Sequence, residues 1–484
     1  MMETRGRTML TAWLVVAAIG AVTACGNNST AGQAVTEGDV GGLPVTHFDS
    51  GLKDDAPEPT LWVDNATGNE IDRLAIATIE DVTDYWSEQM PAHFGEDFQP
   101  LKRLLSYDSS TDDFRACGAS TLGLVNAFFC PSEDLIAWDR GRLLPLVHVK
   151  YGPMSVATVL AHEYGHALQF RLGPNAGINN ATKTIVRELQ ADCFTGNYFR
   201  YLAEGDSPYF TLSTSEGVNA ALSSLYFVRD APGALSNDRG AHGTAFDRTY
   251  AFQLGFEQDP KACAEIDAQT VRERTTQQKF SEQDLQSGKG DARVDERTLG
   301  FVKESLDATF RATGAQPPEI VAGSGSCPDG DGTPPASYCQ DTNTVTVDIQ
   351  ALGTLGEPID MQAEREGQES SGKGDFAAFA SVASRYALAV QKATGGALDD
   401  AGAGLRTACL VGAWAGAANR PRAIKPIIRL SPGDLDEAIL EMLQPKSLIA
   451  SDVNGIPVPN GFARIEALRI GYNEGVEPCG RTFS

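Results

Sequence analysis

Long apolar segments and basic residues are both scarce in this 484-residue sequence. Apart from the mainly apolar stretch 9–22, which is too short to cross a bilayer as a helix, no segment is apolar enough to span a membrane. Lys and Arg number 39 against 64 Asp and Glu, which gives a net charge of −25. Because like charges repel, nucleic acid and anionic lipid are not expected partners.

The N-terminal segment has the order of an export signal: basic residues, then the apolar stretch 9–22, then small residues before Cys25. Residues 22–25 resemble a bacterial lipobox. The resemblance implies cleavage after residue 24, a lipid on Cys25, and an extracytoplasmic protein anchored to the bacterial cell membrane. The alternative is an ordinary secretory signal with an unpaired cysteine nearby.

Histidine is also rare, with six residues in the chain, yet two of them stand four apart in the run His162-Glu163-Tyr164-Gly165-His166. On a helix, residues four apart share one face, so both histidines can bind a single metal ion while Glu163 faces the same cavity. The pattern His-Glu-x-x-His is typical of zinc peptidases, and composition alone produces it at roughly the one-per-cent level. A helix with two surface histidines is the alternative interpretation.

A catalytic zinc site needs three protein ligands and one open position. Glu188 and Asp192 are four apart and therefore lie on one face of a second helix. We expect Glu188 to be the third ligand and Asp192 to accept the free ring N–H of His162. Two carboxylates on a solvated face are the alternative, but the apolar neighbours of both residues favour a buried helix.

Glu163 would then be free to act as general base, taking a proton from the zinc-bound water and handing it to the leaving amine. A hydrogen-bond donor for the oxyanion is also needed, and His242 is the candidate. A single histidine is more often structural than catalytic, so both roles of His242 stay open.

The spacing of the cysteines is a second informative pattern in the sequence. Eight cysteines follow Cys25, and an even number in an exported protein predicts disulfides. The last four repeat the spacing of the first four at offsets of 210, 209, 216 and 216 residues. Sequence around them follows the same offsets, because 189–196 aligns with 405–412 and 246–256 with 462–472. We interpret this as an internal duplication.

The duplication also limits the disulfides, because two copies of one fold should close the same bridges. The simplest pairing that keeps every bridge within its own copy is Cys117–Cys130, Cys193–Cys263, Cys327–Cys339 and Cys409–Cys479.

Hydrophobic spacing places these motifs on elements. Residues 70–89 have helical periodicity, and 155–172 and 179–201 are expected to be helices that carry the two halves of the metal site. Two short β-prone runs, 128–129 and 135–138, predict a strand pair. Strands followed by a metal-bound helix pair indicate an α+β fold.

These blocks resemble one family. The runs 162–169, 188–196 and 242–244 are similar to the bacterial neutral zinc metallopeptidases, a zincin-like group, over about residues 71–263. The resemblance implies a hydrolase with zinc as cofactor, one ion per chain. It also implies that Glu188 is the third ligand.

The run 126–131 looks like the edge strand on which thermolysin-like gluzincins hold a peptide substrate. By that analogy, Asn126 and Ala127 bind substrate. No tyrosine lies between the second histidine and Glu188 to serve as another oxyanion donor, so more of that role falls on His242.

In this alignment the second copy lacks the proposed metal ligands and the general base. Ser384, Arg385 and Leu388 stand in place of His162, Glu163 and His166, Gly404 and Ala408 in place of Glu188 and Asp192, and Val458 falls near the position of His242. We therefore expect a catalytically dead domain with the same fold.

The expected organisation is a lipoprotein signal peptide at 1–24, a flexible tether at 25–59, a zinc metallopeptidase domain at 60–267, a linker at 268–296, and a degenerate metallopeptidase-like domain at 297–484. The expected function is hydrolysis of peptide or protein substrates by an extracytoplasmic, membrane-anchored zinc metallopeptidase. The alternative is a non-catalytic cell-envelope binding or scaffolding lipoprotein that retains a vestigial zinc site.

Overall fold

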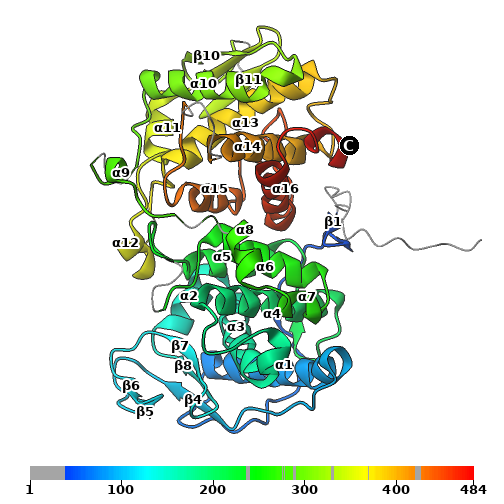
Figure 1. Cartoon of the computed structure of the whole chain (residues 1–484), viewed down its shortest axis with the longest axis vertical. Coiled ribbons are helices and arrows are strands. Elements are labelled where there is room, and N and C mark those ends of the chain that lie inside the picture. The colour runs from blue at the N-terminus through cyan, green and yellow to red at the C-terminus, as the bar shows by residue number, and fades with distance from the viewer. Residues whose placement is uncertain are drawn as a thin grey trace, which may run out of the picture. The chain divides into compact units, whose positions relative to one another are not determined.

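The computed structural model describes residues 39–235, 240–274, 276, 278–286, 290–328, 332–368, 370–419 and 427–483. The predicted signal peptide and the predicted lipidation site Cys25 lie outside these ranges. Within them, helices and small sheets form a mixed α+β fold, as predicted (Figure 1). No helix in the described ranges is long and apolar enough to cross a membrane. We call residues 39–267 the first half and 297–483 the second half.

The first half contains a three-stranded sheet of β4 (Arg103–Tyr107), β8 (Leu135–Asp139) and β7 (Ala127–Cys130), in that order. Central β8 is parallel to β4 and antiparallel to β7, and all five of its residues are buried. A strand covered on both faces needs no alternation of polar residues, which explains its Leu-Ile-Ala-Trp-Asp sequence. The predicted strand pair is confirmed, and β7 is an edge strand.

Two packed helices, α3 (Pro153–Leu172) and α4 (Thr184–Glu204), carry the metal-site motifs. They approach closely at Gly165 of α3, because a Cβ atom there would lie 2.8 Å from Ala191 Cα of α4. Both helices were predicted. The second begins later than expected, since residues 179–183 form a hydrogen-bonded turn before it.

Helix α1 (Glu70–Phe94) packs against α3 and extends past the predicted range 70–89. The side chain of Asn69 caps its start by accepting a hydrogen bond from the amide of Asp72 at 2.8 Å. It ends at Gly95, whose φ of 70° is the left-handed conformation that glycine adopts without strain. The remaining elements of the first half that are used below are α2 (Leu143–Tyr151), β9 (Phe210–Thr211), α5 (Glu216–Phe227), α6 (Ala245–Glu257) and α7 (Pro260–Ala264).

The predicted flexible tether is wrong over its described part, residues 39–59. Strand β3 (Gly51–Leu52) pairs with β9, and the amide of Thr46 donates to Thr214 Oγ1 at 2.8 Å. Val40 is completely buried. The polar composition of this segment suggested an unstructured chain, but its hydroxyl and amide groups have partners in the segment after β9.

The second half also combines a three-stranded sheet with helices. Its sheet has β12 (Thr344–Val347) at the centre, parallel to β10 (Glu319–Ala322) and antiparallel to β11 (Ala336–Cys339). These are the same strand order and pairing senses as in β4, β8 and β7. Its helices are α10 (Glu296–Phe310), α11 (Ile349–Leu355), α12 (Met361–Arg365), α13 (Asp375–Ala393), α14 (Ala403–Asn419), α15 (Asp434–Met442), α16 (Gly461–Glu474) and α17 (Cys479–Thr482).

One helix crossing is equivalent in the two halves. A Cβ atom at Gly255 of α6 would lie 1.8 Å from the carbonyl oxygen of Cys193 on α4. A Cβ atom at Gly471 of α16 would lie at the same distance from the carbonyl oxygen of Cys409 on α14. Because no side chain fits at either point, both crossings depend on glycine.

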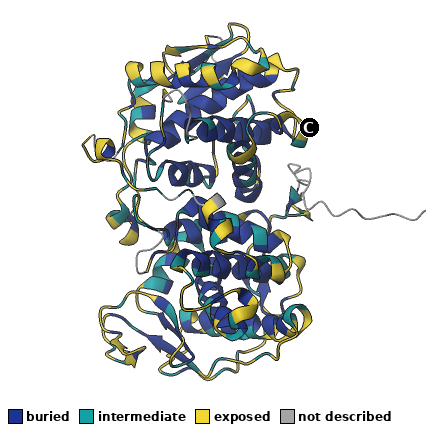
Figure 2. Ribbon diagram, in the orientation of Figure 1, coloured by how far each residue is buried: buried dark blue, intermediate teal, exposed yellow. Residues whose placement is uncertain are grey.

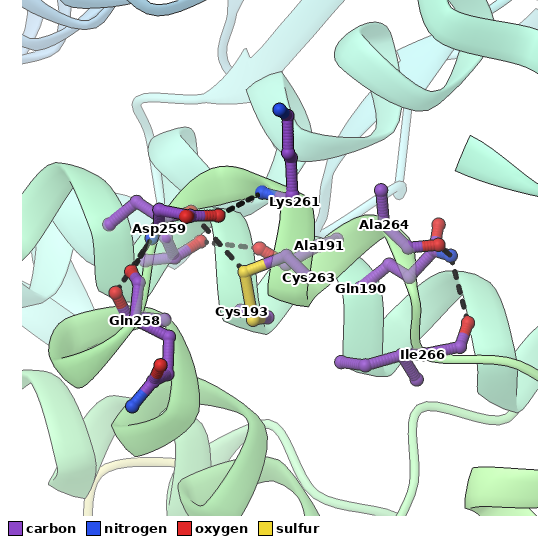
Figure 3. The surroundings of a disulfide bond; sticks show 12 residues. Gln190, Ala191, Cys193, Gln258, Asp259, Lys261, Cys263, Ala264 and Ile266 are labelled. Atoms are coloured by element: carbon purple, nitrogen blue, oxygen red, sulfur yellow. Dashed lines mark hydrogen bonds between the residues drawn. A yellow bond between two sulfur atoms is a disulfide. The ribbon is translucent and has the colours of Figure 1, made fainter. Parts of the chain in front are cut away.

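The structure joins the eight described cysteines into the four pairs that the duplication predicts, namely Cys117–Cys130, Cys193–Cys263, Cys327–Cys339 and Cys409–Cys479. Figure 3 shows the surroundings of the second pair. There the side-chain amide of Gln190 donates to the carbonyl oxygen of Ile266 at 2.9 Å, so a hydrogen bond reinforces the disulfide in fixing the end of the first half to α4.

The predicted linker, 268–296, contains two short helices, α8 (Ala268–Arg274) and α9 (Glu282–Gln286). It touches both halves. The amide of Thr276 donates to Asp247 at 3.0 Å, and Arg429 of the second half donates to Asp284.

The described residues belong to one compact unit, in which α15 and α16 of the second half pack against α5 and α6 of the first. The side chain of Gln253 donates to the carbonyl oxygen of Phe462 at 2.8 Å, and the rings of Phe256 and Phe462 are 5.2 Å apart. Phe246 and Tyr472 make a second ring contact. In Figure 2 these helices carry mainly buried residues, and the ring contacts form an apolar part of the contact between the halves.

Candidate metal site

The three expected ligands meet between α3 and α4. His162 Nε2 lies 3.3 Å from Glu188 Oε2, and His166 Nε2 lies 3.4 Å from Glu188 Oε1. One ligand atom from each residue lies within 4.8 Å of the others. Tetrahedral zinc with bonds of about 2.0–2.1 Å separates neighbouring ligand atoms by roughly 3.3–3.4 Å, a spacing that each histidine has to a different oxygen of Glu188. Nε2 and carboxylate oxygen are also the donor atoms that zinc prefers, so the residues fit this ion.

Burial and charge act against each other in this cluster. Burial alone lowers the pKa of His162, but the carboxylates of Asp192 and Glu188 outweigh it and raise this pKa to about 10. Burial raises the pKa of Glu188, but the two histidines hold it well below its ordinary value. Glu188 Oε2 is buried without a hydrogen-bond partner, as expected for an atom that binds a cation. Zinc needs neutral imidazole, so binding releases protons.

Asp192 occupies the expected supporting position. Its Oδ1 lies 2.8 Å from His162 Nδ1, which leaves Nε2 directed at Glu188. Arg248 of α6 donates to both oxygens of Asp192, at 2.8 and 2.7 Å. All three side chains are buried, so a charge-assisted network fixes the ring of His162.

His166 is fixed by a different group. Its Nδ1 lies 3.1 Å from Gln169 Oε1, and the amide of Gln169 donates to the carbonyl oxygen of Arg187 on α4 at 2.5 Å. One glutamine therefore orients the ligand and joins α3 to α4.

Glu163 does not contact the ligand atoms. Its Oε2 accepts the backbone N–H of Phe129 in edge strand β7 at 2.9 Å, and its side chain lines a cavity of about 570 Å³. The amide holds the carboxylate next to the strand that was expected to bind substrate.

The same cavity brings together most of the predicted site. It is lined by Asn126, Ala127, His162 and His242, and by Arg248. His242 has 46% of its side chain exposed, and its Nδ1 is 3.8 Å from Asp230 Oδ1. The pKa of Asp230 is lowered because hydrogen bonds from His242 and Gly243 outweigh its burial.

Sequence reasoning missed the roles of several residues. Arg248 lies in the block 246–256, which aligns with 462–472, and the sequence alone assigned no role to Arg248 or to the aligned Arg464. The structure shows a similar contact for both arginines. Arg248 donates to Val228 O after α5, and Arg464 donates to Met442 O at the end of α15. No sequence signal pointed to Gln362, Arg365 and Glu366, which the second half contributes to the cavity.

The second half has no ligand set at the aligned positions. The guanidinium of Arg385 is buried and donates to the carbonyl oxygens of Ser451 and Asp452, and burial lowers its pKa to about 10. At Gly404, a Cβ atom would lie 2.8 Å from Val458 Cγ2. Side chains and backbone therefore fill the space where a metal site would be.

Another carboxylate group lies between the linker and the second half. Oxygens of Asp291, Asp375 and Glu437 lie within 4.8 Å of one another. Burial raises the pKa of Asp375 to about 7, although the amide of Ala292 donates to its Oδ2. This group differs from the first cluster because it has no nitrogen ligand.

Comparisons with known proteins agree with this geometry. The relatives include "Uncharacterized protein Rv2575" of Mycobacterium tuberculosis and "Uncharacterized protein Mb2605" of Mycobacterium bovis. Each is 28% identical over 218 residues, which cover 41% of this chain and 68% of the relative. No solved structure matches the chain. Residues 54–266, which include all the candidate ligands, match the family described as "Putative neutral zinc metallopeptidase", the family that the sequence motifs resemble.

Proposed function

We propose that this protein is a zinc metallopeptidase that hydrolyses peptide bonds in the cavity beside α3. The observation that carries the proposal is the placement of His162, His166 and Glu188, which each bring one zinc-type donor atom within 4.8 Å of the others. The family match of residues 54–266 supports it independently.

Zinc, when bound, would activate a water molecule and polarise the scissile carbonyl. Glu163 is the general base: its carboxylate accepts a proton from the attacking water and then donates it to the leaving amine. The hydrogen bond from Phe129 occupies Oε2 and orients the group, so Oε1 is the atom that handles the proton.

The substrate lies along edge strand β7, whose free side can add a peptide strand by main-chain hydrogen bonds. Asn126 is exposed in the cavity, and its side-chain amide has no partner among the described residues, which suits a contact with substrate. His242, held near Asp230, donates to the developing oxyanion.

The second half is proposed to be a degenerate copy of the catalytic domain. The equal strand order and the equivalent glycine crossings support this proposal. So do Gln169 and Gln391, each of which bridges a corresponding helix pair. We propose further that a lipid on Cys25 anchors the protein outside the bacterial cell membrane, with peptides or proteins as substrates.

The test is metal content and turnover on a peptide library for the wild-type chain, Glu163→Gln and Glu188→Ala. We expect about one zinc per chain in the wild type, and Glu163→Gln with full zinc and turnover reduced by about 10²–10⁴-fold. Glu188→Ala should lose both zinc and turnover. Exposed Asp55→Asn is the matched control and should change neither.

A zinc-loaded wild type that turns over no peptide would overturn the enzymatic proposal and favour a binding or scaffolding role. Two zinc ions per chain would contradict the assignment of a degenerate second half.

A further inference from the structure

The second half forms part of the wall of the catalytic cavity. Gln362, Arg365 and Glu366, in and just after α12, line the same cavity as His162 and Glu163. Because these residues belong to the second half, the cavity wall is complete only when both halves are present.

A buried ion pair holds α12 in this place. Glu364 lies 3.3 Å from the guanidinium of Arg229, and both side chains are less than one-tenth exposed. Arg229 belongs to the segment 228–231, which also lines the cavity. A buried pair of this kind is costly to separate, so it fixes the position of α12 relative to the catalytic residues.

Two of the four arginines that line the cavity have carboxylate partners. Arg248 is paired with Asp192, and Arg229 is paired with Glu364. Glu366 accepts a hydrogen bond from Gln362 at 3.1 Å.

Two cavity-lining guanidinium groups have no such partner. Arg142, at the start of α2, and Arg365, at the end of α12, are both exposed. Within the part of the chain that the structure describes, neither side chain makes a hydrogen bond or ion pair. Unpaired positive charge in one cavity is notable in a chain with a net charge of −25.

We propose that this cavity selects peptides that carry a carboxylate near the scissile bond, and that Arg142 and Arg365 bind it. Guanidinium binds carboxylate through two parallel hydrogen bonds, and this preference is stronger where water is partly excluded. The proposal rests on the proposed peptidase function and gives the second half a positive role, because Arg365 is one of the two specificity residues. The carboxylate comes from an Asp or Glu side chain or from a free C-terminus.

The experiment measures kcat/KM of the full zinc-loaded chain on matched peptides. One pair has Glu or Gln next to the cleaved bond, and another pair ends in a free carboxylate or an amide. We expect the wild type to prefer one or both acidic members by about tenfold or more. The pair that shows the preference identifies the source of the carboxylate.

The variants are Arg142→Gln and Arg365→Gln, with Arg311→Gln as an exposed control outside the cavity. Each cavity variant should reduce the acid-to-amide ratio toward one, whereas the control should keep the wild-type ratio. Arg365→Glu should shift the preference toward peptides with Lys. An active enzyme with equal rates on both members of each pair would overturn the proposal.

Binding of the same peptides to zinc-loaded Glu163→Gln, followed by fluorescence anisotropy, separates this proposal from the peptidase function. If acidic peptides bind in a way that depends on the two arginines but the wild type turns none of them over, only the enzymatic function is refuted. The carboxylate site would then still stand. Equal binding of acidic and amide peptides would refute the carboxylate site.

Discussion

Asp192 is completely buried and still carries its charge. Burial raises the pKa of this carboxyl, but the guanidinium of Arg248 and the ring of His162 outweigh it and hold the pKa below its usual range. A fixed negative charge at this point keeps the proton of His162 on Nδ1 and makes Nε2 the metal-binding atom.

The variant Asp192→Asn should therefore weaken zinc binding by about 10–100-fold, because the amide keeps the shape of the side chain and removes its charge. Competition with a coloured chelator measures the dissociation constant. Asp55→Asn, in an exposed segment, is the control. Unchanged zinc affinity would show that Arg248 and Asp192 serve folding alone.

Asp375 gives a prediction about pH. Its pKa is about 7 in the folded chain, above the ~3.9 of an unfolded aspartate, so the native state keeps a proton that the unfolded state has lost. The free energy of unfolding should therefore fall as pH rises from about 4 to about 7. Asp375→Asn needs no proton and should be stabilised relative to the wild type at pH 8, with little difference at pH 4.

Urea unfolding of both chains at pH 4 and pH 8 measures this effect. The exposed Asp399→Asn serves as control and should behave alike at both pH values. A stability difference between Asp375→Asn and the wild type that is independent of pH would contradict the prediction.

The residues of the metal site were predictable because helical spacing is a local property. His162 and His166 share a face in any α-helix, and Glu188 and Asp192 share another. The partners that depend on tertiary structure were not predictable. Phe129 reaches Glu163 from a different element, and Arg248 reaches Asp192 across 56 residues.

At the scale of elements, the crossings of α4 with α6 and of α14 with α16 bring helix backbones into contact. Gly255 and Gly471 supply the space, and each lies against the carbonyl oxygen of a disulfide-bonded cysteine. A methyl group at these points can be accommodated only if the helices move apart.

Gly255→Ala and Gly471→Ala should each destabilise the chain by roughly 3 kcal/mol, because overpacking a backbone contact forces the helices to separate. The matched control is Gly300→Ala on an exposed turn of α10, where a Cβ atom meets nothing within 4 Å. That change should stabilise by about 0.5–1 kcal/mol, since alanine favours helix. Thermal unfolding measures all three, and equal effects of the three changes would contradict this account.

The long helices and the strand pair of the first half were predicted, and the short helix α12 was not. Helices α1, α3 and α4 are long, and the spacing of their apolar residues predicts them from the sequence. Helix α12 has only five residues, and its place in the cavity depends on the pair between Glu364 and Arg229, which no local pattern encodes. The segment 39–59 was mistaken for a tether because its partners lie more than 150 residues away.

At the scale of the molecule, the two halves share a buried apolar contact and a common cavity. Because α5 and α6 pack directly on α15 and α16, unfolding one half exposes apolar surface of the other. The halves should therefore be coupled energetically.

We expect the full chain to unfold in one calorimetric transition, and zinc to raise the temperature of that single transition, since a ligand of the native state stabilises everything coupled to it. Differential scanning calorimetry with zinc and with chelator measures the number of transitions. Two separate transitions, of which only one responds to zinc, would show that the halves are independent.

The position of the disulfides has a consequence for biosynthesis. Each bridge closes within its own half, and Cys263 precedes Cys327, so the four bridged cysteines of the first half can all pair before those of the second half are made. A chain is synthesised from its N-terminus, and domains generally fold in that order. Eight cysteines present together allow on the order of a hundred pairings, whereas four allow only about three. Pairing in the order of synthesis thus removes most of the wrong partners before the second half exists.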